Sequence, residues 1–282
     1  MWKLPIPSVA GARNELEIAL SRDRGEPPYN LTEPEKDAIE ALYQSYDHGL
    51  GRPDDGLKAP NLAGALKDAL HDAFAHVQKD KRLHDLRERL KLPADDCPYC
   101  GFGAVTDLDH YLPRSKFKSL PIYARNLVPC CGPCNGKKQA LADEGAESQF
   151  LHTYFDELPD ERFLFADVSI ENRGLKIGFR AEQSATMEEG TIQRIVFQLE
   201  RLNLNERYQR EATNFVSSQA ASFEMAFGEG GNTEALRDLL IRNARYHRKH
   251  FGLNDWRAAL CFGLSECDQF VDGGFIEVCG LG

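Results

Sequence analysis

Four cysteines in two close pairs are the residues whose spacing most clearly predicts chemistry in this sequence. Two residues lie between Cys97 and Cys100, two lie between Cys131 and Cys134, and thirty residues separate the pairs. Two such turns can close a tetrahedron of thiolates around Zn²⁺ at a Zn–S distance of about 2.3 Å. The alternative of a redox pair needs a thioredoxin-like setting, and two matched pairs argue against it. We therefore predict a structural zinc site.

The remaining cysteines leave two questions open. Cys130 stands beside Cys131, and we assign Cys131 to the zinc because it restores the two-residue spacing to Cys134, which makes Cys130 a buried free thiol. A second metal site near the C-terminus is an alternative to three more buried thiols. Their scattered spacing favours thiols over a site built from Cys261, Cys267 and Cys279 with His247 or His250.

Between and beside the cysteines lie polar residues that suit a hydrolytic site. His110 follows Asp109 directly, and two asparagines, Asn126 and Asn135, come later in the same stretch. An imidazole titrates near neutral pH and can accept a proton there. Carboxylate and amide oxygens are hard ligands that suit Mg²⁺ or Mn²⁺. Taken alone, an Asp-His pair favours ordinary loop residues of a zinc ribbon, because such pairs are common.

The string DLDHYLPRSKF…NLVPCCGPCNGKK, within positions 97–138, resembles the HNH endonucleases in the version with Asn at the third signature position. The resemblance implies a ββα-metal arrangement, with strands near 105–110 and 125–128 and a helix from Pro133 or Asn135 onward. It implies that His110 is the general base and that Asp109 is an acidic metal ligand. It further implies that Asn126 ties down the loop and orients His110, and that Asn135 is a metal ligand.

The same resemblance indicates how the site would bind its substrate. One Mg²⁺ or Mn²⁺ ion would stabilise the charge on the pentavalent phosphorus and on the departing 3′ oxygen. Four basic side chains are close enough in sequence to contact flanking phosphates: Arg114, Lys116, Lys137 and Lys138.

The flanking sequence predicts a mainly α fold with a small inserted ββα-metal (HNH) module and a short β-hairpin, an α+β protein. Thr32 and Glu35 form a capping-box pattern, Asn61 can cap a helix carrying Leu62 to Val77, and a third helix must stop near Pro93. We expect an N-terminal helical region (1–93), the zinc module (94–150) and a mostly helical C-terminal region (151–282). Its hairpin lies near 163–180, and helices follow near 188–201, 205–226 and 233–250, with a shorter one after 254.

The charge distribution argues against binding nucleic acid through bulk electrostatics. The chain carries a formal charge of −10, and only residues 91–140 are net basic, at +3, against −3 before and −10 after them. Any phosphate contact is therefore local. The basic run RNARYHRKHF (242–251) is consistent with DNA contact and equally with a solvated helix face. Neither a signal peptide nor a membrane span is evident. The eight cysteines are poorly spread for a disulfide framework, since five lie between positions 97 and 134, so we expect a protein of the reducing cytoplasm.

Residues 191–208, TIQRIVFQLERLNLNERY, carry a weaker likeness. They resemble the part after the HNH core in stand-alone HNH proteins of bacterial anti-phage systems, such as the nuclease subunit of Septu. That likeness implies a DNA substrate and an ABC-type ATPase partner. A plain alternative is a helix–helix corner packed by Leu202 and Leu204. For the whole chain, the alternative to a nuclease is a non-catalytic zinc-binding adaptor that docks a partner protein.

Overall fold

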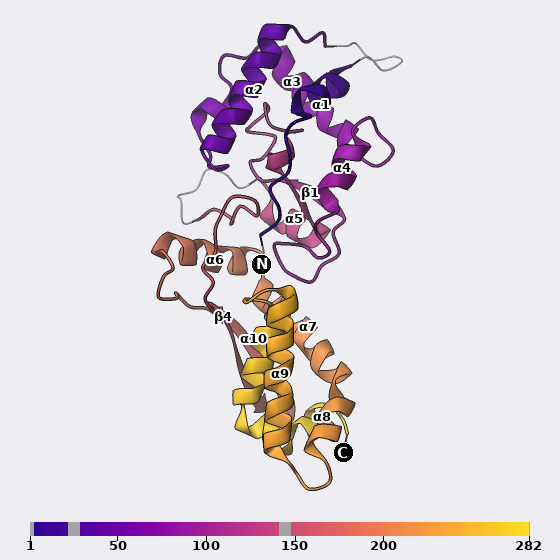
Figure 1. Ribbon diagram of the computed structural model, residues 1–282, viewed down its shortest axis with the longest axis vertical. Helices are drawn as coiled ribbons and strands as arrows, with labels where there is room; N and C mark the ends of the chain where they lie inside the picture. Colours follow the sequence, from indigo (N-terminus) through magenta and orange to yellow (C-terminus); the bar gives the residue numbers. More distant parts are fainter. Residues whose placement is uncertain (1–2, 22–28, 141–147, 282) are drawn as a thin grey trace. The chain divides into compact units, whose positions relative to one another are not determined.

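The computed structural model describes residues 3–21, 29–140 and 148–281. These residues are mainly helical and contain two small antiparallel sheets, which confirms the expected mainly α, α+β fold. They divide into two compact units, each described by itself (Figure 1). One comprises residues 3–140 together with Leu151–Glu157, and the other comprises 148–150 together with 158–281. Within the described residues, no helix has the length and apolarity needed to cross a membrane.

The first unit begins with helices that form a shell around the cysteine-containing segment. The expected capping box is confirmed, because the Thr32 backbone N–H donates to the Glu35 carboxylate at 2.9 Å. The cap expected at Asn61 is wrong, since that helix begins at Gly64 after Ala63. The elements are α1 (Ala12–Leu20), α2 (Glu33–His48), η1 (Asp55–Lys58), α3 (Gly64–Ala73), η2 (Phe74–Val77) and α4 (His84–Lys91).

A strand–loop–strand–helix module follows. Strand β1 (Asp107–His110) pairs antiparallel with β2 (Leu127–Cys130), and α5 (Gly132–Lys138) comes directly after. The return strand starts later than the expected 125–128 because Ala124–Asn126 forms a 3-10 turn, η3. The helix ends at Lys138, where Gln139 takes a positive φ of 54°. Most of its expected continuation, residues 141–147, lies outside the described residues.

The second unit is built on a hairpin covered by helices. Strands β3 (Leu164–Glu171) and β4 (Gly174–Ala181) pair in register, and Asn172 and Arg173 both take positive φ in the two-residue turn, as the hairpin prediction requires. Gly263 lets its own helix, α10 (Trp256–Glu266), approach β3 closely, because a Cβ there would collide with the Ala166 carbonyl. The helices are α6 (Glu189–Arg201), α7 (Leu204–Ser218), α8 (Ala220–Phe227), α9 (Thr233–Phe251), α10 (Trp256–Glu266), η5 (Phe270–Gly274) and α11 (Phe275–Val278).

The expected helix at 205–226 is two helices, because the chain turns at Gln219 between α7 and α8. Aromatic side chains fill the core at both ends of this unit. Tyr208 of α7 packs on Phe179 of β4, and Phe223 of α8 packs on Phe270 and Phe275.

Candidate functional site

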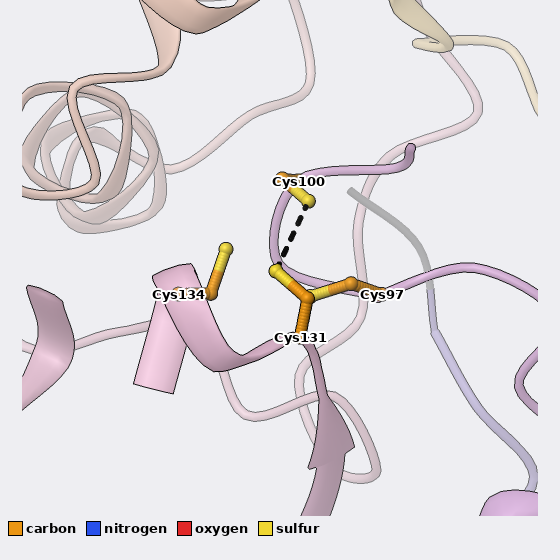
Figure 2. A group of neighbouring side chains, drawn as sticks. All are labelled: Cys97, Cys100, Cys131 and Cys134. Carbon is orange, nitrogen blue, oxygen red and sulfur yellow. Dashed lines mark hydrogen bonds between the residues drawn. The ribbon is translucent and has the colours of Figure 1, made fainter. Parts of the chain in front are cut away.

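The four cysteines of the predicted clamp form one buried cluster (Figure 2). Their sulfur atoms all lie within 4.8 Å of one another, and the Sγ atoms of Cys100 and Cys131 are 3.9 Å apart. A tetrahedral zinc with Zn–S bonds of about 2.3 Å requires sulfur–sulfur distances of about 3.8 Å. The geometry and the four-sulfur donor set therefore fit a structural metal such as zinc. The structure places Cys131 in the cluster and Cys130 outside it.

Local backbone structure brings the two pairs together. The Cys97 carbonyl accepts hydrogen bonds from the backbone N–H groups of Cys100 and Gly101, at 3.2 and 2.7 Å, in a tight turn that needs the positive φ of Gly101. Cys131 stands at the N-cap of α5, and its carbonyl accepts from the Asn135 N–H at 3.0 Å. One pair thus comes from a turn and the other from the start of a helix.

Cys130 and the four clustered thiols have different surroundings. Within the cluster the thiols share hydrogen bonds, which lower the pKa of Cys131 and raise those of Cys97 and Cys134. Burial raises the pKa of Cys130, whose side chain is fully inaccessible in β2, so it stays a neutral thiol. Cys130 is therefore part of the core.

Gly103 closes over the cluster, and we expect Gly103→Ala to weaken metal binding. A Cβ at this position would lie 2.8 Å from Cys131 Sγ and 3.3 Å from Cys100 Sγ, so the sulfur atoms would have to move. The expected result is faster release of zinc to a chelator, measured with a chromogenic dye. Gly136→Ala is the control, because a Cβ there meets nothing within 4 Å. Equal release rates for the two variants would contradict the packing of Gly103 on the cluster.

Asp109 and Lys138 form a buried ion pair that joins β1 to α5. Asp109 Oδ2 lies 2.9 Å from Lys138 Nζ and accepts a hydrogen bond from the Tyr99 hydroxyl at 2.8 Å. Burial raises the pKa of Asp109, and Lys138 opposes that rise. Lys138 also donates to the His110 carbonyl at 2.9 Å. The predicted phosphate contact is wrong for Lys138, because its ammonium group is buried and occupied within the protein.

Asn135 of α5 contacts a carboxylate that sequence reasoning missed. Its side-chain amide donates to Asp107 Oδ2 at 3.0 Å. Asp107 and Asp109 are two residues apart on β1 and therefore share the strand face toward α5. Two carboxylates and an amide oxygen on adjacent elements fit Mg²⁺ or Mn²⁺, which needs one or two carboxylates and keeps several waters. The spacing Asp-x-Asp was the available signal for Asp107.

His110 is the last residue of β1. Its Nε2 lies 2.9 Å from the Pro121 carbonyl, which can only accept, so Nε2 carries the hydrogen and Nδ1 keeps its lone pair. The Phe74 ring of η2 packs edge-on against the imidazole, with centroids 4.3 Å apart. Burial lowers the pKa of His110 to about 3, and Arg114 contributes in the same direction. The imidazole is therefore neutral at cellular pH.

Asn126 joins the two ends of the loop between β1 and β2. Its side chain is fully buried, accepts from the Leu112 N–H at 2.8 Å and donates to the carbonyls of Leu112 and Leu120, at 3.1 and 3.3 Å. Leu120 precedes Pro121, whose carbonyl receives the His110 hydrogen bond. The amide thereby fixes the stretch of loop that orients the imidazole.

Tyr46 and His152, from other parts of the sequence, hold the Asn126 side chain in place through hydrogen bonds. The Tyr46 hydroxyl of α2 lies 3.2 Å from Asn126 Oδ1 and 2.9 Å from His152 Nε2. The Tyr154 N–H donates to His152 Nδ1 at 3.3 Å, so Nε2 carries the hydrogen and donates to the Tyr46 hydroxyl. That hydroxyl is then free to donate to Asn126. No local sequence pattern points to this relay.

The buried imidazole of His152 should make the protein less stable in acid. Burial lowers its pKa well below the usual value, and the charges of Arg52 and Lys138 act in the same direction. Below about pH 6.5 the His152 imidazole binds a proton in the unfolded chain but not in the folded chain. The free energy of unfolding therefore decreases as the pH is lowered further, by about 1.4 kcal/mol per pH unit. Urea unfolding at pH 7.5, 6.5 and 5.5 measures the slope.

The control for this experiment is His152→Gln, which keeps an uncharged polar group of similar reach and removes the titration. His110 remains in both proteins, so its own acid sensitivity cancels in the comparison. We expect the variant to lose stability less steeply between pH 6.5 and 5.5. Identical slopes for the two proteins would show that His152 does not remain neutral in the folded state.

The three other predicted phosphate contacts lie near the surface. Lys137 is exposed on α5, and Arg114 and Lys116 are partly exposed in the loop after β1. The Arg114 guanidinium stands over the Phe74 ring, 5.3 Å from its centroid. Phe74 therefore packs against both Arg114 and His110.

A comparison with known proteins gives one distant relative. The chain is 26% identical over 191 residues to protein ea31 of Escherichia phage lambda, an alignment that covers 64% of this chain and 64% of that protein. It thus spans less than two thirds of the relative's length. No protein-family model matches the sequence, and no solved structure matches it. Fold and site together define a helical α+β protein with a four-cysteine cluster inside a ββα module.

Proposed function

We propose that this protein is a metal-dependent HNH endonuclease that hydrolyses DNA phosphodiester bonds. The observation that carries the proposal is the arrangement around His110. The imidazole ends β1, the Asn126 amide fixes the loop that holds it, and Asn135 stands on the first turn of α5 against the same strand. The cysteine cluster fixes the start of α5 and so helps to position His110, Asn126 and Asn135.

His110 acts as the general base. Its Nδ1 takes a proton from a water molecule, whose oxygen attacks the phosphorus while the 3′ oxygen leaves with the bond electrons. The products are a 3′ hydroxyl and a 5′ phosphate. A pKa of about 3 keeps the imidazole unprotonated but makes it a weak base. A bound phosphodiester would counter the positive charge of Arg114, which is a smaller cause of the low pKa than burial.

Asp109 and Asn135 would hold the catalytic ion, and Asp107 would join them through its contact with Asn135. Bound Mg²⁺ or Mn²⁺ would supply positive charge at the departing 3′ oxygen. The hydrogen bond from Tyr99 and the ion pair with Lys138 are both made to Oδ2 of Asp109, so Oδ1 is the oxygen that would bind an ion. Arg114, Lys116 and Lys137 bind flanking phosphates. Cys97, Cys100, Cys131 and Cys134 hold a structural zinc.

We further propose that the protein is the nuclease effector of a cytoplasmic anti-phage system and works with an ABC-type ATPase partner. The net charge of −10 disfavours unaided capture of DNA, so delivery by a larger protein fits the composition. The resemblance of residues 191–208 to Septu-type proteins points the same way. That segment forms α6 and the start of α7, joined at Asn203 in the left-handed conformation.

A non-catalytic zinc-binding adaptor is the alternative, and two observations favour it. The low pKa of His110 makes it a weak base, and Asp109 is already paired with Lys138. Nicking of supercoiled plasmid by the purified chain in Mg²⁺ or Mn²⁺, against EDTA, separates the two. The nuclease requires nicking that EDTA abolishes. Intact plasmid at every metal concentration, by zinc-loaded protein, would favour the adaptor.

A further inference from the structure

The C-terminal half of α9 carries a basic face that the proposed active site does not use. Arg242, Arg245 and Lys249 recur at intervals of three and four residues, so they lie on one side of the helix, and Arg248 lies at its edge. All four are exposed. No acidic residue occurs between Asp238 and Asp255, in a chain with a net charge of −10.

Three of these four cations have no anionic partner among the described residues. Arg242 pairs with Asp238 at 3.1 Å. Arg245, Arg248 and Lys249 make no ion pair with any residue in the part of the chain that the structure describes. Three unneutralised cations on two turns of helix repel one another, and an external anion would relieve that repulsion.

Aromatic rings accompany the charges. Tyr246 lies on the same side of α9 and is 57% exposed, with His250 packed 4.2 Å from its ring centre. Phe251, at the end of the helix, is 37% exposed and carries the guanidinium of Arg257 at 4.8 Å. The helix dipole favours cations in the last turn. It explains neither the cations at Arg242 and Arg245 nor the exposed ring of Tyr246.

We infer that this α9 face, formed by Arg242, Arg245, Tyr246, Arg248 and Lys249, binds single-stranded nucleic acid. The cations contact the sugar–phosphate backbone, and an unpaired base stacks on the open side of Tyr246. From Arg242 to Lys249 the helix rises about 10 Å, enough for about two phosphates. The inference rests on the proposed nuclease function and deepens it by adding a substrate contact on an element that is not part of the ββα module.

Binding of a fluorescent single-stranded DNA 30-mer to the full chain tests this, with His110→Ala as background so that no strand is cut. Reversing two charges with Arg245→Glu and Lys249→Glu should weaken binding at least tenfold in about 50 mM salt. It should also reduce the slope of log affinity against log salt by about 1.4, the value for two phosphates on a single strand. Tyr246→Ala should weaken binding about fivefold or more while leaving that slope unchanged.

The matched control is Arg173→Glu with Lys176→Glu, which makes the same change in net charge on the β3–β4 hairpin. Both residues already face acidic partners, Glu277 and Glu171. We expect the control to bind within about twofold of the background protein. Equal losses in both double variants, no loss in the α9 variant, or no binding by the background protein would each overturn the inference. Plasmid nicking by the unaltered chain is read separately, so the nuclease proposal stands or falls on its own result.

Discussion

Replacement of His110 by alanine is expected to reduce plasmid nicking by a factor of about 10²–10⁴. The variant lacks the Nδ1 lone pair that would take the proton from water, while the metal-binding oxygens and the four cysteines are unchanged. The cavity left beside Phe74 and Pro121 is small, so the fold should survive. Initial nicking rates in saturating Mn²⁺ measure the loss, and elemental analysis measures the zinc.

His48→Ala provides a matched control, because His48 is an exposed imidazole at the end of α2 in the same unit. Its nicking rate should stay close to that of the unaltered chain. A zinc-replete, folded His110→Ala protein that nicks at a near-normal rate would remove His110 from the role of general base.

Cys97→Ser and Cys134→Ser should each cause loss of zinc and of protease resistance in the first unit. Each leaves three thiolates, and metal binding supplies much of the folding free energy of such a cluster. The cluster also fixes the turn before β1 and the start of α5, so both strands and the helix should loosen. Limited proteolysis, with elemental analysis of about one zinc per chain, measures the effect.

Cys130→Ala is the control for the cysteine experiment. Cys130 is as buried as the cluster but contributes no sulfur to it. Replacing its thiol by a methyl group should leave a small cavity in the core and should not release zinc. Retention of zinc by Cys131→Ser together with its loss from Cys130→Ala would reverse the assignment of the second pair.

Several features of the fold follow from local sequence patterns. Thr32 and Glu35 satisfy each other's hydrogen bonds over three residues, so the start of α2 is visible in the sequence. Asn172 and Arg173 occupy a two-residue turn between alternating apolar runs, which marks the hairpin. Spacing alone also identifies the four-cysteine cluster, because the geometry of one metal ion restricts which residues can bind it.

Other features depend on contacts that no local pattern encodes. Lys138 looks like a surface cation beside Lys137, yet tertiary packing buries it against Asp109 of β1. The relay of Tyr46 and His152 joins positions more than one hundred residues apart. Asp107 gains its significance only from the position of Asn135 on α5. Periodicity indicates which residues are buried, but it cannot give their partners across the fold.

The most direct test of the proposed hydrolysis is cleavage of a DNA substrate in ¹⁸O-labelled water. Zinc-loaded protein is incubated with a short duplex and Mn²⁺, and the product ends are weighed by mass spectrometry. We expect one ¹⁸O atom in each new 5′ phosphate, none in the 3′ hydroxyl, and no product in EDTA. Uncut DNA under all metal conditions, or cut ends that contain no ¹⁸O, would contradict hydrolysis by attack of water on the phosphorus.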